Sequence, residues 1–297
     1  MVAKIKEKLR HLMQDCFLPF MINRDWKREF GYKIDWKNPQ TINEKMQWLV
    51  CFGDTSLWSL CADKYRVREF LEQRGLGDLA IELYGVWKKA EDIDYEKLPN
   101  KFILKCNHDS GTYFIVDKSK GFDKDFINNE LNKALKRKFG YVHNEIYYNK
   151  ISPCIIAEEF LVSHDCSFSS SLVDYKVWCF DGKPYCTWVC HNRTKDSVYV
   201  NVYDMEWNVH PEHSVFTDHY RDGQGLVPKP KTFEQMMNAA AKLSEGFPEV
   251  RVDFYEVDGK LYFGELTFMS LAGKFEVYTK DFLIELGNQC KLPNFNK

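Results

Sequence analysis

The stretch Val250-Arg-Val-Asp-Phe-Tyr-Glu-Val-Asp-Gly-Lys-Leu-Tyr-Phe-Gly-Glu-Leu-Thr-Phe268 decides the fold that we expect for this chain. Apolar and polar side chains alternate in it with the period of two residues that a half-buried strand requires. The Asp-Gly pair at its centre predicts a β-hairpin. Matching the apolar faces of the two strands places Val252 beside Leu266, and therefore Asp253 beside Glu265.

This register depends on the length of the loop. A two-residue Asp-Gly turn would shift the pairing by one and put Asp253 and Glu265 on opposite faces, so we expect a three-residue loop, Asp258–Lys260, with a positive φ at Gly259 or its neighbour. Facing carboxylates repel, and a divalent cation that suits oxygen ligands, such as Mg²⁺, removes the repulsion. Arg251 on the same face could hold a phosphoryl oxygen. A solvated polar face with a compensating arginine explains the hairpin equally well.

The rest of the chain mixes helices and strands without strict alternation, which indicates an α+β protein with antiparallel sheets. We expect helices in the first sixty residues, with a capping box at Thr41–Glu44, and one further helix over Trp58–Arg74. The expected strands cover 101–107, 113–116, 174–180 and 184–189, and the later helices cover 126–139, 232–245 and a segment beginning near Thr279. Residues 155–161 form a short apolar run that two carboxylates interrupt.

Composition and charge narrow the class of protein. The 297 residues allow more than one core, and the net charge of −2 argues against a protein that coats nucleic acid. No run approaches the roughly 20 apolar residues that cross a bilayer, and the N-terminus lacks the apolar core of a secretion signal. The ten cysteines form no Cys-x-x-Cys pair, which favours reduced thiols. We therefore expect a cytoplasmic protein.

The N-terminal segment predicts an amphipathic helix, because Ile5, Leu9, Leu12 and Met13 recur at helical spacing with lysines on the other face. A basic amphipathic helix can make peripheral contact with a membrane surface. We favour the alternative that this helix caps the domain.

The hairpin resembles the metal-binding end of the ATP-grasp superfamily, in which Arg-Val-Asp on one strand is followed by Glu-x-Asn on the next. The resemblance implies ATP and Mg²⁺ as cofactors, with Asp253, Glu265 and Thr267 as metal ligands. Thr267 stands where the family usually has Asn. Arg251 is implied as a catalytic residue that faces the phosphates.

Three further segments resemble phosphate-binding parts of the same superfamily. The Ala-Asp-Lys run is similar to the helix start that supplies a phosphate-contacting lysine, here Lys64. Lys105 lies on an otherwise apolar strand, where its charge needs a partner such as a phosphate. The loop that follows resembles a flap whose backbone N–H groups cover phosphates, here at Ser110, Gly111 and Thr112.

The resemblance continues in the second half of the chain. Ile155–Leu161 resembles the hinge whose backbone binds adenine, with Glu158 or Glu159 reaching the ribose. Lys176 matches a strand position where ATP-grasp ligases carry a basic residue facing the cleft, although a surface lysine would give the same pattern. Arg193 could clamp a substrate carboxylate, but loop arginines often have no such role.

The ordered set resembles an ATP-grasp fold, and additional features such as Asn38–Trp48 resemble its teichuronopeptide-biosynthesis (TupA-like) branch. This implies two α+β lobes with antiparallel sheets that grip ATP, preceded by a helical region. We expect the helical region at 1–60, the N-lobe with the phosphate-covering loop at 61–157, and the C-lobe with the metal site at 158–297.

The function implied by this resemblance is that of a carboxylate–amine ligase. Its partners would be a small-molecule or saccharide carboxylate, such as a uronic acid of a surface polysaccharide, and an amine, joined through an acyl phosphate. No nucleic acid is expected. A glycosyltransferase is the first rival, because Asp123-Lys-Asp125 could be its metal motif, although acidic residues before a helix commonly act as caps. The second rival is a non-catalytic carbohydrate-binding protein with a degenerate ATP fold.

Overall fold

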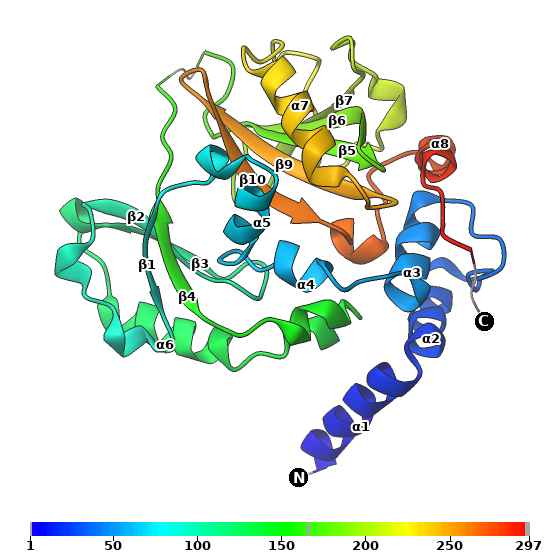
Figure 1. Cartoon of the computed structure of the whole chain (residues 1–297), viewed down its shortest axis with the longest axis horizontal. Coiled ribbons are helices and arrows are strands. Elements are labelled where there is room, and N and C mark those ends of the chain that lie inside the picture. The colour runs from blue at the N-terminus through cyan, green and yellow to red at the C-terminus, as the bar shows by residue number, and fades with distance from the viewer. Residues whose placement is uncertain (1, 165–166, 295–297) are drawn as a thin grey trace.

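The computed structural model describes residues 2–164 and 167–294, and the strands in these residues form two sheets (Figure 1). The smaller sheet has the order β1-β4-β2-β3 and the larger one β10-β9-β5-β6-β7-β8. Neighbouring strands are antiparallel throughout the described residues, except for the parallel pair β7 and β8. The expected α+β class with antiparallel sheets is therefore confirmed.

The bounds of these elements follow the chain. The smaller sheet consists of β1 (Leu83–Trp87), β2 (Lys101–Cys106), β3 (Tyr113–Asp117) and β4 (Ile155–Glu159). The larger sheet consists of β5 (Asp174–Phe180), β6 (Lys183–His191), β7 (Val198–Tyr203), β8 (Tyr220–Asp222), β9 (Val250–Val257) and β10 (Lys260–Thr267). The α-helices are α1 (Val2–Cys16), α2 (Leu18–Phe30), α3 (Ile42–Phe52), α4 (Trp58–Cys61), α5 (Val67–Gln73), α6 (Lys124–Leu135), α7 (Phe233–Ser244) and α8 (Lys280–Gln289). No strand was expected at β1, β4, β7 or β8.

The hairpin of β9 and β10 has the register that the apolar faces predict. Val252 pairs with Leu266, and Asp253 pairs with Glu265. Val252 and Leu266 are both buried. The two carboxylates therefore lie on the same face of the larger sheet, as expected.

The expected three-residue loop is wrong. Val257 pairs with Lys260, so the turn contains only Asp258 and Gly259, whose φ values of 52° and 79° are both left-handed. This is the conformation that a two-residue type I′ turn needs. The pairing then shifts by one residue at Gly264, where a β-bulge inserts an extra residue into β10. The bulge cancels the shift that the short turn introduces and restores the predicted register.

The single helix expected over residues 58–74 is interrupted between α4 and α5. The Asp63 carboxylate accepts hydrogen bonds from the backbone N–H groups of Tyr65 and Arg66, at 2.9 and 3.1 Å. It also accepts one from the Asn107 side-chain amide at 2.8 Å. Side-chain bonds of this kind compete with helical hydrogen bonds, so the chain turns here and does not continue as one helix.

Helices cover both sheets. In the smaller sheet, Phe102 and Leu104 pack in a buried cluster with Ile127 and Leu131 of α6. Helix α7 packs on β5, β6 and β9 of the larger sheet. Helix α3, whose predicted capping box from Thr41 is present, lies beside α8 (Figure 1). The helical start of the chain therefore packs against its C-terminal part.

Two general properties concern the part of the chain that the structure describes. No helix in it is long and apolar enough to cross a membrane. The cysteines in this part of the chain, which are all but the one at position 166, are free thiols. Most of them are buried.

Candidate functional site

Charged side chains form a row across three strands of the larger sheet. Lys176 on β5 lies opposite Asp253 on β9, which lies opposite Glu265 on β10. Directly paired residues point to the same face, and so does Arg251, two residues before Asp253. The hairpin register and the neighbouring strand thus bring two carboxylates and two cations onto one face.

Asp253 is the buried centre of this row. Its Oδ1 accepts a hydrogen bond from Nε of Arg251 at 2.7 Å, and its Oδ2 accepts from Nη2 of Arg251 at 2.8 Å and from Nζ of Lys176 at 2.5 Å. Burial alone would raise the pKa of Asp253, but Arg251 and Lys176 outweigh it and hold this pKa below its ordinary value. These two cations balance Asp253, so the compensating arginine that was one of the two alternatives is present, with Lys176 beside it.

Arg251 is locked in place by several acceptors. Its Nη1 donates to Oγ of Ser270 at 2.8 Å, and its Nη2 donates to Oγ1 of Thr267 at 3.2 Å. Glu265 lies 3.7 Å from Nη2. Burial opposes the charge of Arg251, but Asp253 raises the pKa of its guanidinium. This arginine stays charged and has a fixed orientation.

The donor set of this face fits a magnesium ion. A carboxylate oxygen has two lone pairs, and Oδ1 of Asp253 accepts one hydrogen bond, from Nε of Arg251, so it retains acceptor capacity. The Glu265 side chain is 48% exposed, so its carboxylate is accessible to an ion from solvent. Carboxylate oxygens are the ligands that Mg²⁺ prefers. The hydroxyl of Thr267 already accepts from Arg251, and its role as a third ligand stays a prediction.

A second buried carboxylate, Glu158, organises the cations of the smaller sheet. It pairs across β2 with Ile103, on the face that also carries Lys105. Its Oε1 accepts from Arg68 at 2.8 Å, and its Oε2 forms an ion pair with Lys105. Glu159 pairs with Phe102 at the end of β4 and lines the cavity between the two sheets. Glu158 therefore positions Lys105, and the ribose contact expected of one glutamate stays a prediction.

Lys64 is a further cation of the candidate site. It lies in the turn between α4 and α5, where its Nζ donates to the carbonyl oxygen of Asp109. Burial lowers the pKa of the Lys64 ammonium, an effect that Glu265 opposes and Lys105 reinforces. The Lys64 ammonium thus interacts electrostatically with Glu265 of the larger sheet and with Lys105 of the smaller sheet.

The loop between β2 and β3 begins beside this lysine. Gly111 has a left-handed φ of 89°, and both Ser110 and Gly111 are exposed. Oγ1 of Thr112 donates to Oδ2 of Asp109 at 2.6 Å, and Arg137 lies 3.6 Å from the same oxygen. The loop is thus anchored at its two ends and open at its tip. Its expected contact with phosphates stays a prediction.

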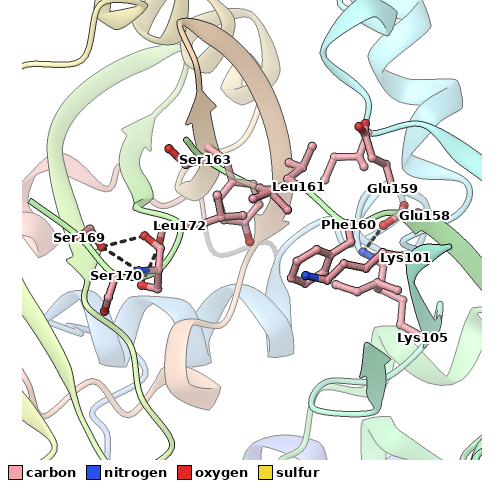
Figure 2. Close-up of a pocket in the computed structure, with 16 residues that line it drawn as sticks. Lys101, Lys105, Glu158, Glu159, Phe160, Leu161, Ser163, Ser169, Ser170 and Leu172 are labelled. Carbon is pink, nitrogen blue, oxygen red and sulfur yellow. Dashed lines mark hydrogen bonds and ion pairs between the residues drawn. The ribbon is translucent and has the colours of Figure 1, made fainter. Parts of the chain in front are cut away.

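A cavity of about 540 Å³ lies between the two sheets (Figure 2). Its size is typical of small-molecule sites. Lys105 and Glu158 contribute from the smaller sheet, and Tyr255 and Gly264 from the hairpin. The remaining wall includes Phe160, Leu161, Val162 and the serines at 163 and 169–171. Its apolar walls and cationic side fit a nucleotide.

Two details shape this cavity. The Lys101 ammonium lies 4.1 Å from the centre of the Phe160 ring, and Figure 2 shows the two side chains against each other. At Gly264, a Cβ atom would come within 3.0 Å of the backbone oxygen of Asp253. The glycine of the β-bulge therefore allows β10 to lie close to the backbone of β9 at this point of the cavity wall.

Arg193 is paired in this structure. Its Nη2 donates to Oδ2 of Asp174 at 2.9 Å, and Asp174 also lies 4.0 Å from Lys176. The Arg193 side chain is about half exposed. Sequence reasoning missed Asp174, which joins Arg193 to the charged row. The proposed contact of Arg193 with a substrate carboxylate stays a prediction.

Glu145 is a second residue that sequence reasoning missed. It is buried just before a short 3₁₀ helix, Ile146–Lys150, and its Oε1 accepts from the hydroxyl of Tyr147 at 2.8 Å. Burial raises the pKa of Glu145 to about 7, and Glu265 adds to the rise. No local pattern reveals this carboxyl, because its burial depends on Tyr147 packing against Trp58 from another segment.

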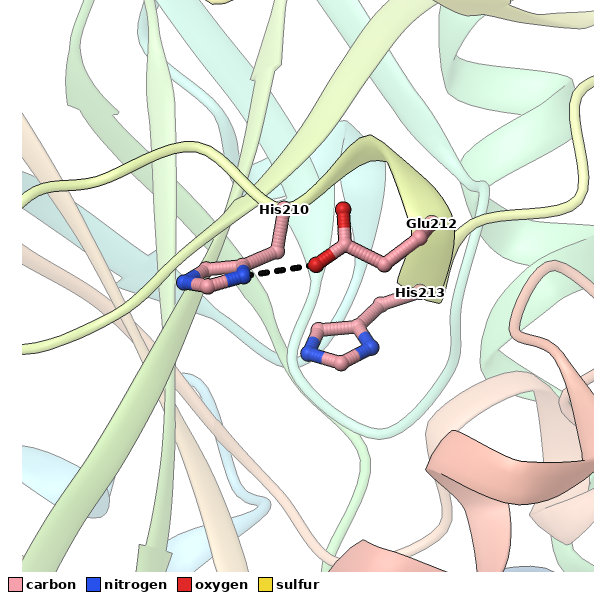
Figure 3. Close-up of side chains that lie close together, drawn as sticks. All are labelled: His210, Glu212 and His213. Carbon is pink, nitrogen blue, oxygen red and sulfur yellow. Dashed lines mark hydrogen bonds and ion pairs between the residues drawn. The ribbon is translucent and has the colours of Figure 1, made fainter.

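One cluster of metal-binding residue types lies elsewhere, in the connection between β7 and β8 (Figure 3). Nδ1 of His210 is 2.8 Å from Glu212, and its Nε2 is 3.1 Å from Asp204. The rings of His210 and His213 are stacked, with 21° between their planes, and His213 lies flat on Phe282. Lone pairs in the planes of stacked rings do not converge on one ion. The Asp253–Glu265 pair is therefore the better metal candidate.

The two hairpin carboxylates should differ in their effect on stability. Asp253→Ala leaves Arg251 and Lys176 without their buried anion, so we expect the free energy of unfolding to fall by about 3–5 kcal/mol. Glu265→Ala removes a half-exposed group and should change it by less than about 1 kcal/mol. Because the folded pKa of Asp253 lies below the ordinary 3.8, its contribution persists at neutral pH and is lost only below about pH 4. Urea denaturation measures both, and equal small losses would contradict this asymmetry.

Glu145 should make stability depend on pH. Between its ordinary pKa of 4.5 and its folded pKa of about 7, the folded protein holds a proton that the unfolded chain has released. The free energy of unfolding should therefore fall by about 3 kcal/mol as pH rises through this window. In Glu145→Gln this fall should disappear, whereas the exposed control Glu206→Gln should retain it. Urea denaturation at a series of pH values is the measurement, and an unchanged profile in Glu145→Gln would refute the assignment.

Comparisons with known proteins bear on this geometry. Among solved structures, the D-alanine–D-alanine ligase of Bacillus anthracis in complex with ATP has 18% identity and a TM-score of 0.40, over 70% of this chain and 55% of that one. The chain thus spans little more than half the length of that ligase. The ATP-grasp ligase PsnB, with a phosphomimetic variant of its minimal precursor, Mg and ADP, has 12% identity and a TM-score of 0.41, over 95% of this chain and 73% of that one.

The comparison with curated proteins gives no match. The sequence does match a protein family, described as TupA-like ATPgrasp, over residues 44–291. This range is most of the chain, and it contains both sheets and all the charged residues described above. The chain therefore belongs to the TupA-like ATP-grasp family and has an ATP-grasp fold.

Proposed function

We propose that this protein is an ATP-dependent carboxylate–amine ligase. The observation that carries the proposal is the row of Lys176, Asp253 and Glu265 across the larger sheet, together with Lys105, which Glu158 holds on the smaller one. Cations in this number suit a phosphate chain, and the carboxylates suit the metal that accompanies it. Membership of an ATP-grasp family supports the same function.

Each part of the site has a role in this proposal. Lys64 and Lys105 bind phosphates, because Lys64 lies against the start of the loop that would cover them and Lys105 lines the cavity between the sheets. Asp253 and Glu265, with Thr267, hold Mg²⁺. ATP supplies the phosphoryl group that activates a carboxylate, and the metal neutralises phosphate charge.

The remaining residues position the reactants. Arg251 and Lys176 hold Asp253 in one orientation and add positive charge where the phosphoryl group is transferred. The adenine lies against the segment at Phe160 and Leu161, the ribose near Glu158 or Glu159, and the loop 110–112 covers the phosphates. These assignments are supported by the cavity that the segment lines and by the loop that begins beside Lys64.

The reaction would have two steps. A carboxylate oxygen of the substrate forms a bond to the terminal phosphorus, and the bond to the ADP oxygen breaks, which yields an acyl phosphate. The amine then forms a bond to the acyl carbon, phosphate leaves, and the amine nitrogen loses a proton. Positioning and charge neutralisation provide most of the acceleration in such transfers, so no protein nucleophile is needed.

The substrate class is the finer part of the proposal. The TupA-like resemblance favours a uronic acid of a surface polysaccharide or its precursor as the carboxylate, with Arg193 near the end of the charged row as its contact. A glycosyltransferase is less favoured, because Asp123 of its expected metal motif caps α6 by accepting from the N–H of Phe126 at 2.9 Å.

A trapping assay tests the reaction type. With ATP, Mg²⁺, hydroxylamine and a panel of uronic acids, the wild-type protein should produce a hydroxamate and ADP. Glu265→Gln should lower the rate on the order of a hundredfold or more, because it removes a metal ligand. Hydroxamate is measured by its iron(III) colour and ADP by a coupled assay. Turnover of a UDP-sugar, or ATP binding without hydroxamate from any acid, would overturn the ligase assignment.

Nucleotide binding tests the role of Lys105. Lys105→Ala removes a charged donor, while Glu158 keeps its ion pair with Arg68, so the fold should persist. The dissociation constant for ATP in the presence of Mg²⁺ should rise at least about tenfold, which isothermal titration calorimetry can measure. The exposed control Lys97→Ala should bind as the wild type does. Unchanged affinity in a folded Lys105→Ala protein would return this lysine to a surface role.

A further inference from the structure

Helix α1 is attached to the rest of the protein by its polar face. Nε2 of Gln14 donates to the backbone oxygen of Tyr141 at 2.9 Å and to Oδ1 of Asn144 at 2.6 Å. The His11 ring is stacked on the Tyr141 ring, with 3.9 Å between their centres. In Figure 1 the helix extends away from the two sheets. Its other face is therefore directed toward solvent.

That other face is apolar. Ile5, Leu9 and Leu12 recur at the spacing of one helix face, and Phe17 and Phe20 follow where α2 begins. Each of these five side chains, here named the apolar stripe, is more than half exposed. The N-terminal helix therefore contacts the domain, but not through these apolar residues. An exposed row of large apolar side chains on one surface indicates a site of interaction.

Positive charge surrounds the apolar stripe. Lys6 and Lys8 lie on its two flanks, as the 3.6-residue period requires. A cavity of about 490 Å³ adjoins it at Phe20, between α2 and Trp36. The cavity's cationic lining residues are Arg24, Lys27, Arg28 and Lys33.

Part of this charge is already balanced, because Asp25 pairs with Arg24 and Arg28. Even so, residues 1–37 contain nine Lys and Arg against five Asp and Glu, a net charge of +4 in a chain whose total is −2. The segment that carries the stripe thus has a net positive charge, whereas the rest of the chain has a net negative charge.

We propose that the apolar stripe and its cationic surroundings dock the protein onto a membrane surface that contains anionic phospholipid. Apolar side chains on one face of a helix enter the headgroup region, and basic residues around them attract anionic lipids. The contact would be peripheral. A second copy of the chain fits less well, because two stripes in contact would bring their flanking lysines together. This inference is independent of the proposed ligase activity.

Sedimentation with lipid vesicles tests the proposal. The full chain should sediment with vesicles of equal parts phosphatidylcholine and phosphatidylglycerol. Binding to phosphatidylcholine alone, or to the mixed vesicles at 0.5 M salt, should be at least about tenfold weaker. Equal binding to neutral and anionic vesicles, or binding to neither, would overturn the proposal.

Matched variants locate the contact. Leu9→Ser with Phe20→Ser should reduce vesicle binding at least about tenfold, and Lys27→Glu with Lys33→Glu should reduce it similarly. The control pair Phe126→Ser with Leu226→Ser, also highly exposed but elsewhere in the chain, should bind vesicles as the wild type does. Circular dichroism and ATP affinity should be unchanged in all variants. Vesicle binding that survives both stripe and charge variants would exclude this surface.

Light scattering after size-exclusion chromatography examines the alternative occupant. We expect the wild type and the Leu9→Ser, Phe20→Ser variant to have the same mass in solution. A wild-type dimer that the variant converts to a monomer would assign the apolar stripe to self-association and overturn membrane docking.

Discussion

The buried ion pairs of Asp253 are the constraint on which the rest of the site depends. A carboxylate removed from water is tolerated only when cations and hydrogen bonds compensate it, so Arg251 and Lys176 must remain in contact with it. This requirement joins β5 to β9 through side chains as well as through the backbone. The same two cations stay charged near the cleft, so one structural device both stabilises the sheet and supplies the positive charge that the proposed chemistry needs.

Each of the two sheets has a buried carboxylate that is paired with two cations. In the smaller sheet, the buried carboxylate of Glu158 holds Arg68 and Lys105, much as Asp253 holds its own cations. Lys64 follows Asp63 in the turn between α4 and α5, where it donates to the backbone oxygen of Asp109. Cations that would repel one another are thus kept close together by carboxylates behind them. Such an arrangement is preorganised for an anion, so binding requires little reorganisation of these side chains.

In the N-terminal helix, the polar face contacts the rest of the protein and the apolar face is exposed. Its apolar spacing is that of a helix which packs on a core. Yet Gln14 and His11 on the opposite face make the contacts with the body of the protein. Specific hydrogen bonds and one ring stack thus determine the orientation of the helix, and the apolar stripe is left exposed beside a basic cavity.

Features that depend on residues close together in the chain could be predicted from the amino-acid sequence alone. Alternation in β9 and β10 was enough to pair Asp253 with Glu265, because a shift of one residue would have exposed the apolar set. The loop was mispredicted, since a bulge at Gly264 compensates a shorter turn and leaves the same outer register. Three features are seen only in the tertiary structure: the burial of Glu145, the pairing of Arg193 with Asp174 and the exposed face of α1. These depend on contacts between distant segments, and local periodicity carries no information about which segments will meet.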